Sequence, residues 1–67
     1  MSIKEYIINN FKDDKHENLE NAINECVKEQ DEETLPGMGV FLELIWKGST
    51  EEEKKNMINI LYKELHK

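Results

Sequence analysis

Arginine is absent from this 67-residue sequence, and cysteine, proline and tryptophan each occur once. Without arginine the chain lacks the planar, bidentate donor that best recognises phosphates and guanine edges. Its nine lysines are outnumbered by fifteen acidic residues, which gives a net charge of −6. Because nucleic-acid affinity depends on cations that displace counterions from phosphates, this composition argues against direct binding to DNA or RNA.

A second cysteine and a long apolar run are also missing. Cys26 has no partner for an intramolecular disulfide, which favours a reducing compartment. No segment approaches the ~18 consecutive apolar residues of a membrane span, and the first residues do not form a signal peptide. We therefore expect a soluble protein that stays inside the cell and does not contact a membrane.

The length allows only a small core. Sixty-seven residues lie near the lower end of what folds alone, so we expect a single helical domain over residues 1–67. Self-association would bury additional apolar surface. A homodimer and a complex with another protein are therefore alternatives to a monomer.

The first half of the sequence predicts two amphipathic helices. Ser2 and Glu5 have the spacing of a capping box, so the first helix is expected to begin at Ile3 and to break at residues 12–14. An aspartate in that break can cap a second helix, which should run to about Glu29. The acidic residues that follow have no periodicity and predict a loop as far as Thr34.

The most apolar stretch is LPGMGVFLELIWK, residues 35–47, in which Glu43 is the only polar residue between Val40 and Trp46. A helix over about residues 36–46 would be apolar almost all round, and such helices are buried. Glu43 stacks with Gly39 and Lys47 on one narrow stripe, which is the edge expected to face water.

Residues typical of helix ends flank this apolar helix. Thr34 is its expected cap, and Gly48 stands where a left-handed residue would end it. Ser49 or Thr50 is then expected to cap a fourth helix, with Glu52 or Glu53 as the reciprocal acid. The fourth helix should bury Met57, Ile58, Leu61 and Leu65.

Together these patterns predict an all-α fold, a small single-domain bundle of about four short helices packed around the central apolar helix. The three amphipathic helices would each give one apolar stripe to a helix that needs cover on most sides.

Candidates for chemistry are weak. His16, Glu20 and Asp13 are too few and too solvated for a metal site, and Cys26 on an apolar helix face is expected to be a buried, inert thiol. We therefore expect no enzyme activity, no cofactor, no metal and no small-molecule substrate.

Two features of the apolar helix allow more than one interpretation. Gly37 and Gly39 are expected to let a neighbouring helix approach closely, or to permit an unusual backbone entry into the helix, rather than to bind an anion. Trp46 could be a hot-spot anchor for another protein or the largest plug in a small core, and the core is favoured.

The apolar helix also carries a motif. The string LPGxGV, followed by a glutamate and an Ile-Trp pair, and then by Ser49, Glu53-Lys54 and Met57, resembles the small acid-soluble spore protein I family. Upstream positions correspond without a gap, so the resemblance covers nearly the whole chain. The motif residues, as structural or partner-contact positions, are Leu35, Pro36, Gly37, Gly39, Val40, Glu43, Ile45 and Trp46.

This resemblance implies a non-enzymatic, minor spore protein that is made during sporulation in the forespore and retained in the spore core. It offers no catalytic or binding residues to transfer, and the DNA-contact motif of the abundant DNA-coating spore proteins is not found. The expected role is a small structural or protein-interaction module. The alternative is a nucleoid- or nucleic-acid-associated protein that uses Lys54, Lys55, Lys63 and Lys67.

Overall fold

A computed structural model of the chain describes residues 2–29 and 33–67. Within these ranges it contains four α-helices and no strand. The helices are α1 (Ile3–Phe11), α2 (His16–Glu29), α3 (Leu35–Gly48) and α4 (Glu51–Leu65). The predicted all-α class with four helices is confirmed.

Side-chain caps begin two of the helices as the sequence predicts. The Ser2 hydroxyl accepts a hydrogen bond from the backbone N–H of Glu5 at 3.1 Å and starts α1. At α4 the Thr50 hydroxyl accepts from the Glu53 N–H at 3.2 Å, while the Thr50 N–H donates to Glu53 Oε1 at 2.9 Å. This complete capping box selects Thr50 over Ser49 and Glu53 over Glu52.

The ends of α3 differ from the prediction. Gly48 is not left-handed, and the helix continues through it to a C-cap at Ser49. The Ser49 hydroxyl donates to the carbonyl of Ile45 at 2.6 Å, which satisfies a terminal carbonyl without a left-handed residue. Thr34 occupies the N-cap position, but its backbone is helical rather than extended and its side chain makes no capping hydrogen bond.

The connection before α3 is only partly described. Glu33 and Thr34 form a turn, as the predicted loop requires. The remainder of that predicted loop, residues 30–32, lies outside the described residues.

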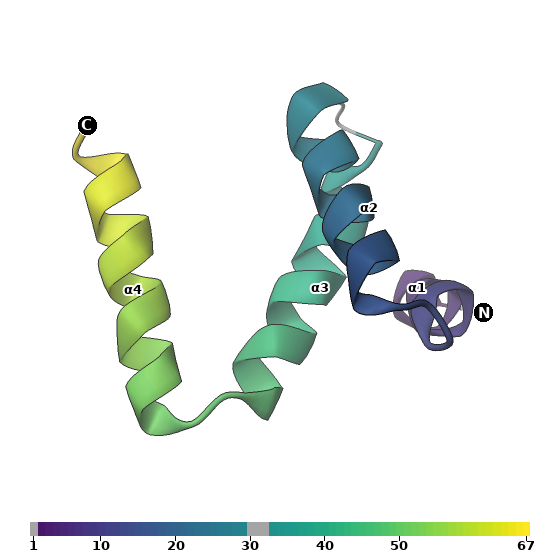
Figure 1. The fold of residues 1–67 in the computed structure, drawn as a ribbon, viewed down its shortest axis with the longest axis horizontal. Helices are drawn as coiled ribbons and strands as arrows, with labels where there is room; N and C mark the ends of the chain where they lie inside the picture. Colours follow the sequence, from purple (N-terminus) through teal and green to yellow (C-terminus); the bar gives the residue numbers. More distant parts are fainter. Residues whose placement is uncertain (1, 30–32) are drawn as a thin grey trace.

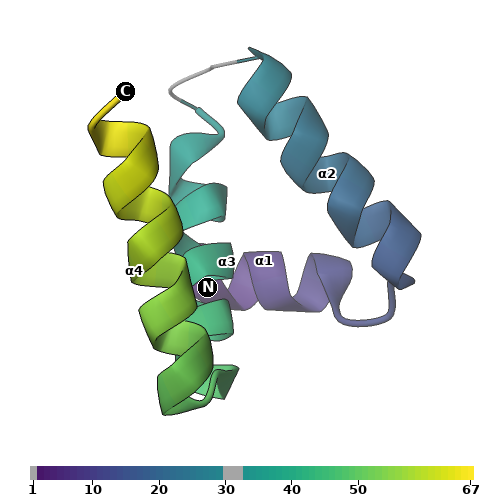
Figure 2. The same cartoon turned by 60° about the vertical axis from the view of Figure 1, so that its left-hand side comes forward.

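Helix α3 is the central element of the arrangement. In Figures 1 and 2, α2 and α4 lie on opposite sides of α3, and α1 crosses beside it on the side of α2. Helix α4 leaves the end of α3 after the two residues Ser49 and Thr50 and runs back at an open angle (Figure 1). The pair α3 and α4 therefore forms a V rather than a closed hairpin.

The core is smaller than the sequence suggests. Phe11 of α1 and Phe41 of α3 meet edge to face with ring centroids 5.2 Å apart, which is a favourable geometry for aromatic pairs. However, no side chain among the described residues is fully buried. The radius of gyration is 13.0 Å, compared with about 11 Å for a compact chain of this length.

The expectation that α3 is covered on most sides is therefore wrong. Leu42 in the middle of α3 is 58% exposed, because α4 does not lie along this helix. The physical reason lies in the connection. Ser49 closes α3 and Thr50 opens α4, so both connecting residues are fixed by capping hydrogen bonds and hold the two helices apart.

Candidate interaction surface

Helix α3 presents apolar side chains on two different faces. Phe41, Leu44 and Ile45 form one face and point towards α1 and α2. Leu42 and Trp46 belong to the other face, which lies towards α4. At 3.6 residues per turn the centres of these two sets are about a third of a turn apart. Each face borders a hollow, and the two hollows differ in how far they are covered.

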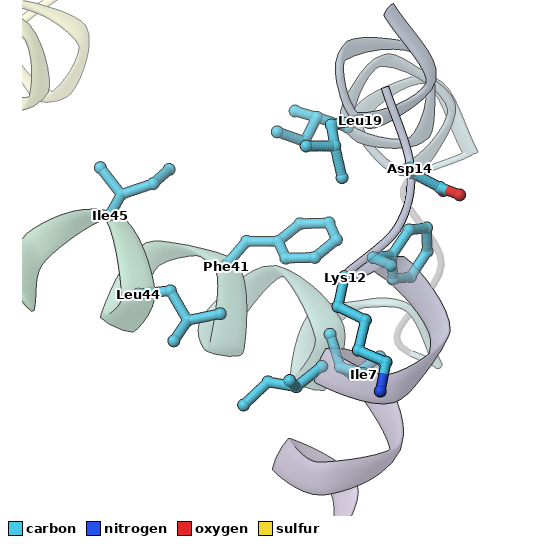
Figure 3. Close-up of a pocket in the computed structure, with 10 residues that line it drawn as sticks. Ile7, Lys12, Asp14, Leu19, Phe41, Leu44 and Ile45 are labelled. Atoms are coloured by element: carbon cyan, nitrogen blue, oxygen red, sulfur yellow. The ribbon is translucent and has the colours of Figure 1, made fainter. Parts of the chain in front are cut away.

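The first hollow is a pocket of about 330 Å³ between α1, α2 and α3, shown in Figure 3. Its wall is apolar apart from Lys12 and Asp14 at the break between α1 and α2. Figure 3 shows the Asp14 carboxylate directed away from the Phe41 ring. The apolar lining residues are Ile7, Ile8, Phe11, Leu19, Ile23, Phe41, Leu44 and Ile45. This pocket lacks the convergent polar groups with which binding sites orient a substrate.

The second hollow is a groove of about 470 Å³ between α3 and α4, which we call the α3–α4 groove. Its central side chains are large and apolar, and Leu61 of α4 is 53% exposed although it faces α3. The groove is lined by Gly39, Leu42, Glu43, Trp46 and Lys47 of α3 and by Met57, Ile58 and Leu61 of α4.

Trp46 lies at the end of this groove that is nearest the α3–α4 connection. The ammonium nitrogen of Lys54 is 5.5 Å from the centroid of the Trp46 ring, a cation–π contact that joins α4 to α3. The indole remains 38% exposed, so the favoured prediction that Trp46 fills the core is wrong. Lys54 also approaches Glu51 at 3.7 Å.

Glu43 is the charged residue in the middle of α3. Its carboxylate pairs with Lys47 at 3.3 Å, which confirms the predicted i,i+4 pair, and also with Lys4 of α1. The hydrogen bond from Lys4 is the main cause that holds the pKa of Glu43 below its ordinary value. The same bond raises the pKa of Lys4. The sequence offered no signal for this Lys4 contact, because the two residues are 39 positions apart.

The two motif glycines lie in different surroundings. A Cβ built at Gly37 would be 3.4 Å from Ile7 Cδ1, so this glycine allows α1 to approach, as predicted. No atom lies within 4 Å of a Cβ built at Gly39, and the same prediction is wrong there. Gly39 instead forms part of the floor of the α3–α4 groove.

The remaining motif residues flank these positions. Leu35 begins α3 and is exposed, Pro36 stands in the first turn, where its missing N–H is harmless, and Val40 is half-buried. Ile45 lines the pocket and its carbonyl accepts the bond from Ser49. The motif therefore spans both faces of α3 and does not converge on one site.

The candidate metal ligands and the cysteine do not form a site in the described residues. His16 and Glu20 are exposed on α2, and the described residues contain no group of three side chains suited to hold a metal ion. Cys26 is half-buried rather than buried, and it lies against α1 and α3. In the described part of the chain, no helix combines the length and apolar character that a membrane crossing requires.

The sequence of residues 1–65 matches the family model described as "Small, acid-soluble spore protein I". The chain belongs to the small acid-soluble spore protein I family. This confirms the resemblance carried by the α3 motif, and it identifies the chain as a protein of the sporulating cell or spore.

Individual relatives of this spore protein agree with the family match. The small acid-soluble spore protein I of Geobacillus sp. (strain WCH70) is 34% identical over 61 residues, covering 91% of this chain and 86% of the relative. Those of Bacillus licheniformis and Bacillus subtilis (strain 168) are each 33% identical over 91% of this chain, covering 87% and 86% of their own lengths. No solved structure matches the chain.

Proposed function

We propose that this spore protein is a non-enzymatic component of the spore core, made during sporulation, that acts by protein association through the α3–α4 groove. The observation that carries the proposal is the exposure of large apolar side chains along both walls of this groove. Soluble monomers rarely expose large contiguous apolar patches, and such patches mark sites of interaction.

The polar groups near the hollows support a non-enzymatic role. A general acid or base needs a pKa near the working pH. Glu43 borders the α3–α4 groove, but its pKa is lowered by Lys4, so this carboxylate stays ionised at neutral pH. Its Oε1 also pairs with both Lys4 and Lys47, which favours a structural role.

We do not propose the alternative role in nucleic-acid association. Two of the four lysines invoked for it have acidic partners, since Lys54 approaches Glu51 and Lys67 approaches Glu64 at 2.9 Å. The net charge of −6 opposes a phosphate backbone. A fluorescence-anisotropy titration with duplex DNA at low salt is expected to show no binding.

Association and location can be tested together in the native sporulating host. A photo-crosslinking amino acid at Leu42, in the groove, is compared with the same amino acid at Val27, which is equally exposed on α2 and lines neither hollow. We expect protein adducts from position 42 alone, recovered with the core fraction after the spore coats are removed. Absence of adducts at position 42, or recovery with the coats, would contradict the proposal.

A further inference from the structure

We propose that the α3–α4 groove is filled by α4 of a second copy of this chain, whose own groove receives α4 of the first. The inference rests on the proposed function and names the partner. Such a contact is isologous, because the same surface of each copy meets the other and the pair closes on itself.

The amount of exposed surface matches what a stable dimer buries. The accessible surface of the chain is 6011 Å², whereas a compact monomer of 8.0 kDa exposes about 4,500 Å². The surplus is roughly 1,500 Å² per chain. Obligate homodimers bury about 1,000–2,500 Å² on each partner, so one second copy is enough to cover this surplus.

Helix α4 lines one side of the groove and is also suited to fill the groove of a second copy. Ile58, Leu61 and Leu65 follow one another at helical spacing along one stripe, and Leu65 is 72% exposed. An apolar helix stripe of this kind is what fits an apolar groove between helices. On the floor, Gly39 has open space above its backbone, so a helix from outside can approach α3 closely there.

Charge permits this contact between two copies of an acidic protein. Residues 51–67 contain four acidic residues and four lysines, so this segment is neutral although the whole chain carries −6. Within the groove, the charge of Glu43 is balanced by Lys4 and Lys47. Contact through α4 and the groove therefore avoids the repulsion that the rest of the surface would produce.

The charge order of α4 also selects an antiparallel pairing. Glu51, Glu52 and Glu53 occupy the first turn and Lys63 the last, with Lys67 beyond it. Antiparallel α4 helices place the acidic end of each copy near the basic end of the other and oppose their helix dipoles favourably. A parallel pair would bring like charges together at both ends.

Sedimentation equilibrium over a series from micromolar to millimolar protein tests the inference. The wild-type chain is expected to approach twice its mass of 8.0 kDa. Leu61→Glu places an unpaired charge in the contact and is expected to weaken the dimer on the order of 100-fold or more. Circular dichroism of each variant checks that the helices are retained.

A second pair of variants separates blocked association from failed folding. Gly39→Leu puts a large side chain into the groove at a helix position with open space, so the chain should fold and lose the dimer. Gly48→Leu is the matched control, because it makes the same change in the same helix, also in open space, outside the groove. It should retain the wild-type dimer.

Three results would overturn the inference. The first is a wild-type mass of 8.0 kDa at every concentration. The second is a dimer that tolerates both Leu61→Glu and Gly39→Leu, since its contact would lie elsewhere. The third is equal loss of dimer in Gly39→Leu and Gly48→Leu. A monomer that still gives crosslinks from position 42 in the host would contradict the second copy as partner while leaving the proposed function intact.

Discussion

The two faces of α3 have similar composition and different cover. Towards α1 and α2, Phe41 packs on Phe11 and both rings are half-buried, whereas Leu44 and Ile45 at the border of this face stay 39% and 48% exposed. Towards α4, Leu42 and Leu61 are both more than half exposed, although the helices that carry them are joined by only two residues. An apolar surface is therefore covered by the elements that can reach it, not by the nearest ones in the sequence.

The connections explain this difference. The break between α1 and α2 spans residues 12–15, where the turn at Lys12 and Asp13 lets both helices return to one side of α3. The connection between α3 and α4 consists of Ser49 and Thr50, and both residues are engaged in caps. Strong caps on each side of a short connection fix its geometry, and here they keep the two apolar walls apart.

Truncation of one side chain on each face of α3 should give the largest difference in the free energy of unfolding. We expect Phe41→Ala to cost about 2–3 kcal/mol, below the full range for a buried phenylalanine because the ring is half-buried. Leu42→Ala should cost less than about 1 kcal/mol in dilute solution, where its side chain faces water. Urea unfolding followed by circular dichroism measures both.

Repeating the same unfolding at high protein concentration sharpens the contrast. The loss in Leu42→Ala should grow, because dimer formation adds a contact that this variant lacks, while the loss in Phe41→Ala should stay unchanged. Equal losses for the two variants in dilute solution would show that Phe41 and Leu42 are equally covered and would contradict the difference between the two faces.

Removal of the α4 cap should have the next largest effect. Thr50→Ala deletes the hydroxyl that accepts from the Glu53 N–H and is expected to cost about 1 kcal/mol. Thr50→Ser keeps the oxygen and serves as the control, with most of the stability retained. Thermal unfolding measures both variants, and a Thr50→Ala protein as stable as the serine variant would show that the capping box does not hold α4.

The two motif glycines should respond with different magnitude to the same change. Gly39→Ala adds a methyl group in open space inside a helix and is expected to stabilise the dilute protein by about 0.5–1 kcal/mol. Gly37→Ala should gain less or lose stability, because its Cβ meets Ile7 Cδ1 at 3.4 Å. Urea midpoints of the two variants give the comparison. A larger gain in stability at Gly37 than at Gly39 would contradict the close approach of α1 to Gly37.

The smallest expected effect is a pH dependence at Glu43. Its folded pKa is lowered, so the stabilisation is complete above the ordinary value of 4.5 and is lost as the pH falls through the folded pKa. The pKa of Lys4 is raised. The stabilisation that arises from the charge of Lys4 is therefore complete below the ordinary value of 10.5 and is lost as the pH rises through the folded pKa.

The Glu43 ion pairs are accessible to solvent, which keeps this effect small. Thermal unfolding from neutral to acidic pH should therefore show a slightly steeper loss in the wild type than in Glu43→Gln. A steeper loss in Glu43→Gln would reverse the sign derived from the pKa shift.

Local signals in the sequence predicted the elements well. The spacing of Ser2 and Glu5 and that of Thr50 and Glu53 locates two helix starts, because a cap is a contact between neighbours in the chain. The LPGxG string identifies the family, and the periodicity of α2 gives its apolar face. These features depend on residues within one or two helical turns.

Contacts between distant segments could not be predicted in the same way. The apolar composition of α3 indicates that this helix favours burial, but it does not indicate which helix covers it. The prediction that α4 packs along α3 is therefore wrong. The bond from Lys4 to Glu43 and the contact of Lys54 with Trp46 depend on the angles between helices. The prediction that a left-handed Gly48 ends α3 is wrong, because the Ser49 hydroxyl caps the helix instead.

The most direct test of the central claim uses Trp46, the single tryptophan, which lies in the α3–α4 groove. Its emission maximum is recorded during dilution of the wild-type chain, beside the mass at each concentration. If the groove is open in one chain and closed by a second, the emission should move to longer wavelength at the concentration where the dimer dissociates. An emission maximum that stays constant while the mass falls from twice 8.0 kDa to 8.0 kDa would contradict the claim.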